Sequence, residues 1–465
     1  MSKPSGKPTA AELEQADWIE KDSRYVFGWR HRPRIIFERG QGMRLTDVSG
    51  KEYLDFVSGH ISLLLGHNHP ALREAMLQQA DRLWHQYKYF SARKVIELAE
   101  QLAALLPGEL SVTNFASVGS EANEVAMRIA RGANKGFDFV AVISGLYGGT
   151  FGVESLNSVG GRRKQGLGPM LMPSAVQAIL PPYCYRCPLG YSSDENEPCC
   201  HKSDFACLRA SDEYIDRFST GEVTAIFAET ITNAGGVIVP PAGWLPRLKA
   251  LAEKWGALLV LDEVPVAPAK TGRMWAFEHY NVVPDIVTLG KGFGGGLPIA
   301  AAVTTPEIAE RARAGNTGAP WAGTFAGDPL AAAVALRQLQ ILVDEDYPTR
   351  AAKCGDVLML RLNELKERYE VIGDVRGKGL FIGIEVVKDR ESKEKDDLLM
   401  HRICWNAHDE GLLIAGHENV LKMHPALIVT PAEIDEATEK LERAIQRALN
   451  GEPRDVDVFT EGTLK

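Results

Sequence analysis

The sequence has no apolar run long enough to cross a membrane. Apolar stretches such as residues 257–261 (ALLVL) have the length of a strand, whereas a membrane-spanning helix needs about 20 apolar residues. The first residues, MSKPSGKPTAAELEQADW, contain no apolar stretch of the kind that a secretory signal requires. We therefore expect neither a secretory signal nor a membrane partner.

The sequence also has no excess of positive charge. Its 52 Lys and Arg against 61 Asp and Glu give a net charge of −9. An acidic protein has no overall field that attracts nucleic acid, so we expect no nucleic-acid partner. The seven cysteines are an odd number, and a chain of 465 residues does not need disulfides to fold. These features favour a cytoplasmic protein.

The organisation of the chain predicts a large domain and a smaller one built from both chain ends. Residues 1–70 are expected to form an N-terminal arm, partly helical, and part of the small domain, with an antiparallel meander over 34–56. Residues 71–330 are expected to form the large domain, which includes a Cys-rich insertion at 181–207. A long helix begins near residue 330, and residues 331–465 complete the small domain.

The large domain alternates helical segments with short apolar runs. The runs are FVAVIS (139–144), AIFAET (225–230), ALLVLDE (257–263) and DIVTLGK (285–291). Apolar strands that alternate with helices predict an α/β fold, in which helices cover both faces of a mainly parallel sheet. Ligands of such sheets bind outside the carboxyl ends of the strands. The polar residues that follow each run are therefore the candidates for a site.

Asp262 and Lys291 each follow an apolar run. A lysine between a buried strand and a glycine run is desolvated, which lowers its pKa and frees the amine as a nucleophile. A buried carboxylate needs a partner, and a protonated pyridine nitrogen is one. The alternatives are a lysine in a solvated loop and an aspartate that caps a turn or a helix.

Two other segments add a phosphate site and an aromatic ring. Val118, Gly119 and Ser120 precede a helix, whose exposed N–H groups bind phosphate. Tyr147, in a glycine-rich turn, could stack on a flat ring. A capped helix and an aromatic packed under a loop are the alternatives. Together with the lysine and the carboxylate, these residues describe one cofactor.

The order of these elements resembles the class III aminotransferases of the fold type I pyridoxal-phosphate group, over roughly residues 35–450. The stretches that carry the resemblance are YLDFVSGHISLLLGHNHP, FASVGSEANEVAMRIAR, GGVIVPPAGWL, LLVLDEV, FEHYNVVPDIVTLGKGFGGGLPIAA, TFAGDPLAAA and IGDVRGKGLFIGIEVVKDR. Within the class, the chain looks most like the dialkylglycine decarboxylase and amino-caprolactam racemase types.

This resemblance implies pyridoxal 5'-phosphate as the cofactor. Lys291 would hold it as a Schiff base, and Asp262 would pair with its pyridine nitrogen. Val264 would contact the cofactor, as would Val118, Gly119, Ser120 and Tyr147. Thr324 would reach the phosphate of the neighbouring subunit's cofactor, which implies a homodimer with shared active sites.

The chain departs from the family at several positions. Pro265 stands where a Gln usually bonds the cofactor's phenolic oxygen. Lys422 stands where an Arg usually clamps the substrate's α-carboxylate, and a lysine pairs with a carboxylate only as a point charge. His60 is a candidate acid or base, with a structural histidine as the alternative. Glu229 either contacts the substrate or braces the site.

The insertion contains Cys184, Cys187, Cys199 and Cys200, followed by His201 and Cys207. This spacing is typical of zinc ligands and suggests a structural zinc ion. Cysteines that simply pack or stay reduced are the alternative.

The resemblance predicts an enzyme that moves an amino group between an amine or amino acid and a keto acid or aldehyde. Racemisation and decarboxylation use the same residues and remain alternatives, on amino acids or amino amides. A catalytically weak cofactor-binding sensor is the non-enzyme alternative.

Overall fold

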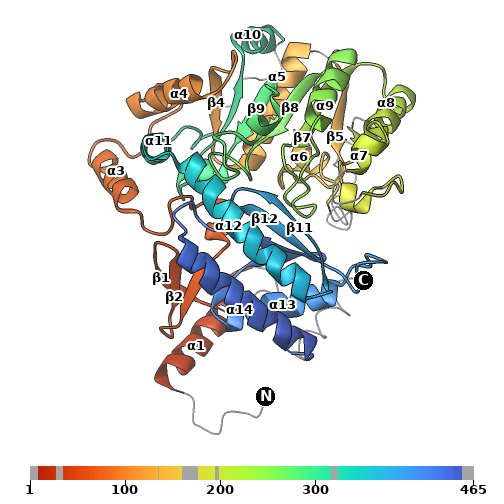
Figure 1. Cartoon of the computed structure of the whole chain (residues 1–465). Coiled ribbons are helices and arrows are strands. Elements are labelled where there is room, and N and C mark those ends of the chain that lie inside the picture. Colours follow the sequence, from red (N-terminus) through yellow and green to blue (C-terminus); the bar gives the residue numbers. More distant parts are fainter. Residues whose placement is uncertain are drawn as a thin grey trace.

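The structure is a computed structural model, which describes residues 9–27, 35–134, 136–159, 176–193, 198–315 and 323–452. The expected N-terminal arm and Cys-rich insertion lie partly outside these ranges. In Figure 1 a sheet with its covering helices lies above a second body, in which elements from both chain ends lie side by side.

The larger sheet has seven strands in the order β4-β10-β9-β8-β7-β5-β6. Only β10 runs antiparallel to its neighbours in this sheet. The predicted α/β fold with a mainly parallel sheet is thereby confirmed. The strands are β4 (Val112–Ala116), β5 (Asp138–Val142), β6 (Val176–Ile179), β7 (Val223–Glu229), β8 (Leu258–Asp262), β9 (Ile286–Leu289) and β10 (Ala300–Thr304).

Strand β8 shows why this sheet needs helices on both faces. Leu259 and Leu261 belong to one hydrophobic cluster, while Leu258 and Val260 belong to another. Alternate side chains of a strand point to opposite faces, so both faces are apolar and must be covered. The helices around the sheet are α4 (Arg93–Leu105), α5 (Gly119–Asn134), α8 (Ala206–Phe218), α9 (Trp244–Lys254), α10 (Pro306–Ala314) and α11 (Pro329–Asp344).

The two chain ends meet in a four-stranded sheet, β1-β2-β3-β13. Its first three strands form the predicted antiparallel meander, and β13 from the C-terminal part pairs with β3 in parallel. A helix precedes the meander, as expected for the N-terminal arm. These elements are α1 (Ala10–Tyr25), β1 (Phe37–Gln41), β2 (Arg44–Asp47), β3 (Glu52–Asp55) and β13 (Leu412–Leu413).

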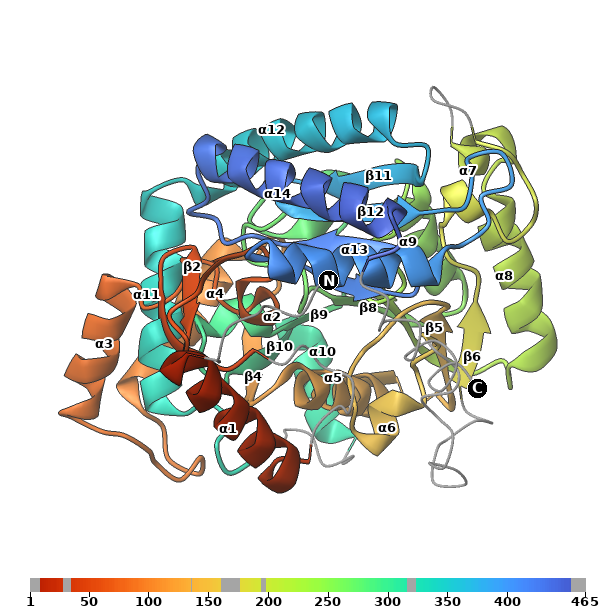
Figure 2. The ribbon, with the colours of Figure 1, turned by 90° about the horizontal axis from the view of Figure 1, so that it is seen from below.

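A third sheet, β11-β12-β15-β14, lies in the C-terminal part of the chain. Figure 2 shows α12 and α14 next to each other along β11 and β12. The elements are α12 (Tyr347–Arg368), β11 (Ile372–Lys378), β12 (Phe381–Val386), α13 (Asp397–Asp409), β14 (Ala415–His417), β15 (Val420–Met423) and α14 (Pro431–Leu449).

The remaining elements are short, apart from α3. Helix α3 ends at Ala80, and the Gln79 side chain donates to the carbonyl of Leu83 (2.8 Å), just beyond the helix. Among the described residues, no helix is both long and apolar enough to span a membrane. These elements are α2 (Ser58–Ile61), α3 (Pro70–Ala80), α6 (Phe151–Glu154), η3 (Cys184–Arg186), α7 (Cys199–Lys202), η4 (Ala276–Tyr280) and η5 (Lys291–Gly294).

Candidate active site at the carboxyl edge of the sheet

Four of the predicted site residues lie at the carboxyl ends of parallel strands. Glu229 and Asp262 are the last residues of β7 and β8, and they are direct partners in the strand register. Lys291 follows β9, and Tyr147 follows β5. Because these strands are parallel, their carboxyl ends share one edge of the sheet.

Asp262 is buried, and both of its carboxylate oxygens are held. The backbone N–H of Val264 donates to Oδ1 (2.8 Å), and the side-chain amide of Asn123 donates to Oδ2 (2.9 Å). Burial raises the pKa of Asp262 to about 6, and the hydrogen bond from Asn123 opposes this shift. The carboxylate is thus fixed in orientation at the floor of the site.

Lys291 is close enough to Asp262 and Glu229 to feel both charges. Burial lowers the pKa of Lys291, and the two carboxylates oppose this effect. Its backbone has a φ of 46°, in the left-handed region that non-glycine residues rarely adopt. Such strain is concentrated at functional sites, where the surrounding structure enforces it.

The turn between β4 and α5 leads directly into a helix of 16 residues. A side chain at Gly119 would place its Cβ 2.9 Å from Val264 Cγ1, so only glycine fits there. Ser120 Oγ accepts a hydrogen bond from the N–H of Gly149 (3.1 Å), which leaves its own hydrogen available for an anion. Val118 is 48% exposed. A helix N-terminus of this kind suits a phosphate.

Tyr147 is buried beside these residues. Its hydroxyl donates to the carbonyl of Phe227 (3.1 Å), and its ring meets that of Phe227 edge-on at 6.0 Å. The packed-aromatic alternative therefore describes its contacts within the chain. Stacking on a cofactor ring stays a prediction.

Glu229 braces the turn that carries Tyr147. Its two oxygens accept hydrogen bonds from the N–H groups of Leu146 and Asn233, each 2.9 Å long. Burial, with a smaller contribution from Asp262, raises the pKa of Glu229 to about 7. The bracing alternative thus describes its contacts, while its charge is felt by Lys291 and Lys422.

Lys422, on β15, and His60, on α2, lie close to Lys291. Lys422 is 8% exposed, and its Nζ donates to the carbonyl of Ala234 (3.4 Å). Burial lowers the pKa of Lys422 to about 8. Desolvation, together with Lys291 and Lys422, lowers the pKa of His60 to about 4, so its imidazole is neutral at pH 7.

Three further residues around the site were not predicted from the sequence. Asn123 joins α5 to β8 and to the carbonyl of Tyr147 (2.7 Å). Lys270 is fully buried and donates to the carbonyls of His424 (2.9 Å) and Pro425. His424 stacks on Phe381 with ring centroids 4.2 Å apart. Lys270 and His424 lie shortly after Pro265 and Lys422, and these two departures from the family pattern were the available signals.

Thr324 is exposed on the surface of the chain, next to Phe325, which is 62% exposed. The structure thus places it at the surface, where a neighbouring subunit could meet it. The ring of His85 is 5.1 Å from that of Phe325, which brings the segment around His85 next to Phe325. The exposed aromatic side chains of this segment, together with Phe325, are called the aromatic patch. The patch comprises Trp84, Tyr87, Tyr89, Phe90 and Phe325.

The residues present fit pyridoxal phosphate. Among the described residues, Asp262 forms no ion pair with a lysine or arginine side chain, so a protonated ring nitrogen would supply the cation that a buried carboxylate needs. Gly119 lies against the side chain of Val264, so the turn before α5 has no room for a side chain there. A nucleophilic amine with a lowered pKa, that of Lys291, completes the set.

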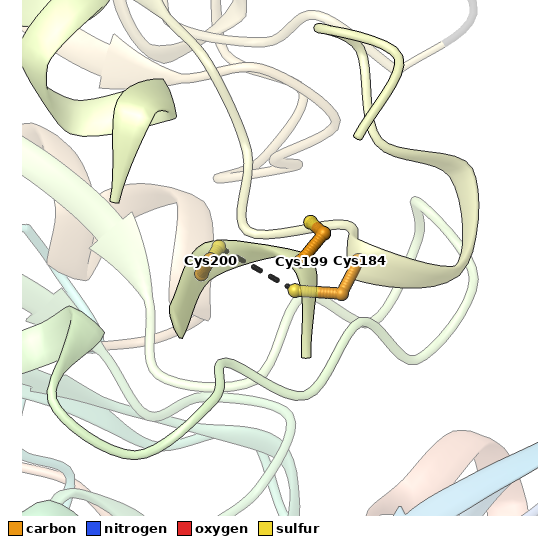
Figure 3. Close-up of side chains that lie close together, drawn as sticks. All are labelled: Cys184, Cys199 and Cys200. Atoms are coloured by element: carbon orange, nitrogen blue, oxygen red, sulfur yellow. Dashed lines mark hydrogen bonds between the residues drawn. The ribbon is translucent and has the colours of Figure 1, made fainter. Parts of the chain in front are cut away.

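The predicted cysteines also meet. Figure 3 shows Cys184, Cys199 and Cys200, whose sulfur atoms all lie within 4.8 Å of one another. Cysteines that are this close either share a metal ion or pack as small apolar residues.

Comparison with known proteins now identifies the family. A family model described as aminotransferase class-III matches residues 27–445. The chain belongs to the class III aminotransferase family. This membership makes it a pyridoxal-phosphate-dependent enzyme, and the family prediction is confirmed.

Relatives of the chain include enzymes of two activities. It is 36% identical to the leucine/methionine racemase of Thermococcus litoralis, over 88% of this chain and 90% of the relative. It is 34% identical to the alanine/serine racemase of Pyrococcus horikoshii, over 97% and 93%. Among solved structures, the thermostable (S)-enantioselective omega-transaminase of Thermomicrobium roseum matches with a TM-score of 0.85 and 32% identity, over 93% and 98%. Such neighbours confirm the fold type I architecture.

Proposed function

We propose that Lys291 is the catalytic centre of an aminotransferase that moves an amino group between an amine or amino acid and a keto acid or aldehyde. The observation that carries this proposal is the convergence of Lys291, Asp262 and the N-terminus of α5 at one edge of the sheet. Val118, Gly119 and Ser120 hold the cofactor's phosphate, and Tyr147 and Val264 contact its ring.

Each residue has a defined part in the reaction. When bound, pyridoxal phosphate supplies an electron sink for the carbon that carries the substrate nitrogen. Asp262 keeps the ring nitrogen protonated. Lys291 Nζ takes the proton from the substrate carbon and returns it, and its lowered pKa supplies a free amine for this task. Glu229 holds the turn beneath the ring.

Lys422 is the proposed contact for a substrate carboxylate. Its ammonium group is buried beside Lys291 and Glu229, so a carboxylate that enters would meet a desolvated cation. A lysine provides one point charge rather than a bidentate grip, which admits carboxylates in more than one position. We expect amino acids, including ω-amino acids, among the substrates.

Racemisation of an amino acid is the second candidate function. The likeness to the two racemases favours it, because both exceed 33% identity over most of the chain. His60 offers a neutral imidazole close to Lys291, as a second acid or base would require.

The proposal also includes a homodimer in the cytoplasm. The aromatic patch beside Thr324 groups several exposed aromatic side chains, whereas a single exposed apolar residue is common on any surface. Such a patch suits a subunit interface. Thr324 of each subunit then reaches the neighbouring subunit's cofactor phosphate.

The proposal keeps the two domains expected from the sequence. Residues 71–330 form the large domain, and residues 1–70 and 331–465 form the small one. The proposed cofactor set also includes a structural zinc ion, which takes no chemical part in the reaction.

The deciding experiment separates transfer from racemisation. Leucine, methionine, alanine, serine and 4-aminobutyrate are incubated with the holoenzyme, with and without a keto acid acceptor, beside Lys291→Ala. Chiral chromatography measures both enantiomers and the new amino acid. We expect a new amino acid only when the acceptor is present. Formation of the D-enantiomer without an acceptor would show that the enzyme is a racemase and would contradict the proposed amino transfer.

A further inference from the structure

Five of the seven cysteines gather in the insertion, in or next to three separate helical elements. Cys184 begins η3, with Cys187 one residue beyond its end, Cys199 and Cys200 begin α7, and Cys207 lies in α8. The sulfur atoms of Cys184 and Cys200 are 3.4 Å apart, and those of Cys200 and Cys207 are 3.7 Å apart. The Cys184 and Cys200 side chains point toward each other in Figure 3.

These distances suit a shared metal ion better than a disulfide. A disulfide needs sulfur atoms about 2.05 Å apart, and all of these cysteines are free thiols. Four thiolates at about 2.3 Å from a tetrahedral zinc ion lie about 3.8 Å from one another. The separation of 3.4 Å and the limit of 4.8 Å for Cys184, Cys199 and Cys200 bracket that value.

The geometry points to one zinc ion held by the thiolates of Cys184, Cys187, Cys199 and Cys200. Cys187 is the fourth ligand because it forms a Cys-x-x-Cys pair with Cys184, directly after η3, and its side chain is close to that of Cys199. Ser193 ties the two ligand segments together, since its Oγ donates to the carbonyl of Cys184 (3.0 Å) and accepts from the N–H of Cys199 (2.9 Å). Four soft thiolates in a preformed cluster select zinc over magnesium or calcium.

Cys207 is assigned to packing rather than to the metal. The four proposed ligands come in two pairs that are close in sequence, whereas Cys207 stands alone on α8 and is only 4% exposed. It belongs to the same hydrophobic cluster as Leu208 and Trp244. A small apolar residue beneath a metal site is a common role for a buried cysteine.

The metal site would anchor the insertion to the C-terminal sheet. Tyr183 and Arg186, which flank the Cys184 ligand, both donate to the buried carboxylate of Glu385 on β12. Strand β12 is the direct neighbour of β15, and Gly383 is paired with Lys422 in their register. The zinc ion therefore fixes a contact one strand away from the proposed substrate lysine.

Metal analysis of the full-length protein tests this inference without any activity measurement, so it is independent of the proposed reaction. The protein is purified under reducing conditions without chelator or added metal. We expect one zinc ion per chain by elemental mass spectrometry, unchanged in the control Cys354→Ser, a buried cysteine of α12. Cys184→Ser should lose the zinc, and Cys184→His, which keeps a zinc ligand, should retain it. Substoichiometric zinc in the wild type would overturn the assignment.

Cobalt substitution gives a second readout, and its wild-type arm needs no variant. Co²⁺ in the wild-type protein should show intense visible bands and near-ultraviolet thiolate charge-transfer bands, and Cys207→Ser should keep both. Absence of these bands would overturn the site, as would a Cys184–Cys200 disulfide found by peptide mass spectrometry. Loss of the bands in Cys207→Ser would overturn the assignment of the four ligands.

Discussion

The side-chain amide of Asn123 donates to Oδ2 of Asp262 over 2.9 Å, and so connects helix α5 to the end of strand β8. The same nitrogen lies 2.7 Å from the carbonyl of Tyr147. The hydroxyl of Thr288 donates to Oδ1 of Asn123 (2.9 Å), which fixes the orientation of the amide. The buried amide of Asn123 therefore fixes helix α5, the turn that carries Tyr147 and the carboxylate of Asp262 relative to one another.

Asn123→Leu should weaken cofactor binding while the fold persists. The substitution removes one of the two hydrogen bonds to Asp262 and leaves the carbonyl of Tyr147 without this donor. Loss of a hydrogen bond to a charged group is worth about 1.5–3 kcal/mol, so the Kd for pyridoxal phosphate should rise roughly 10- to 100-fold. Fluorescence titration measures the Kd. Asn134→Ala, at the far end of the same helix, is the control, and equal affinities of Asn123→Leu and wild type would contradict the role of Asn123.

Glu229→Gln should change the pH dependence of stability of the cofactor-free protein. The folded pKa of Glu229, about 7, lies above its ordinary value of 4.5, so the folded state favours the protonated carboxyl. Glu229 therefore lowers the free energy of unfolding, by an amount that grows as pH rises from 4.5 to 7 and then stays constant. Gln lacks this contribution but also lacks one acceptor, which costs about 1–3 kcal/mol at every pH.

Urea unfolding at pH 5 and pH 8 measures this effect. The free energy of unfolding of Glu229→Gln minus that of wild type should be about 2–3 kcal/mol higher at pH 8 than at pH 5. A difference that is the same at both pH values would show that the carboxyl of Glu229 is not held protonated by the fold.

Lys422→Arg should remove a pH dependence of substrate binding. Burial lowers the pKa of Lys422 to about 8, so the wild-type cation is lost as pH rises through 8. The KM for an amino acid should therefore increase above pH 8 in wild type and stay flatter with Arg, which remains charged. Lys422→Ala should raise the KM roughly 10- to 100-fold at pH 7. An amine that has no carboxylate is the control substrate, because its KM should be the same in wild type and in the Lys422 variants.

Much of the fold and of the candidate site followed from local sequence pattern. The apolar runs that end at Asp262 and before Lys291 are buried strands, because nothing but a doubly covered sheet accommodates them. Parallel strands then bring their carboxyl ends together, so the convergence of the site was predictable from topology.

What the sequence could not predict depends on contacts between distant segments. Asn123 stands in the first turns of a helix, and its three partners lie 24, 139 and 165 residues away. Lys270 carried no signal of its own in the sequence, yet it is buried and donates to the carbonyls of His424 and Pro425. Tyr147 was correctly placed after a strand, but its bond to the carbonyl of Phe227 required the packed structure.

The central claim is that Lys291 holds the cofactor, and borohydride reduction of the loaded protein followed by peptide mass spectrometry tests it most directly. The account predicts a yellow protein whose label is found on the Lys291 peptide, and a Lys291→Ala variant with neither colour nor label. Lys270 and Lys422 are buried near the site and serve as internal controls. A label on either of them, or a wild-type protein that takes up no label, would contradict the account.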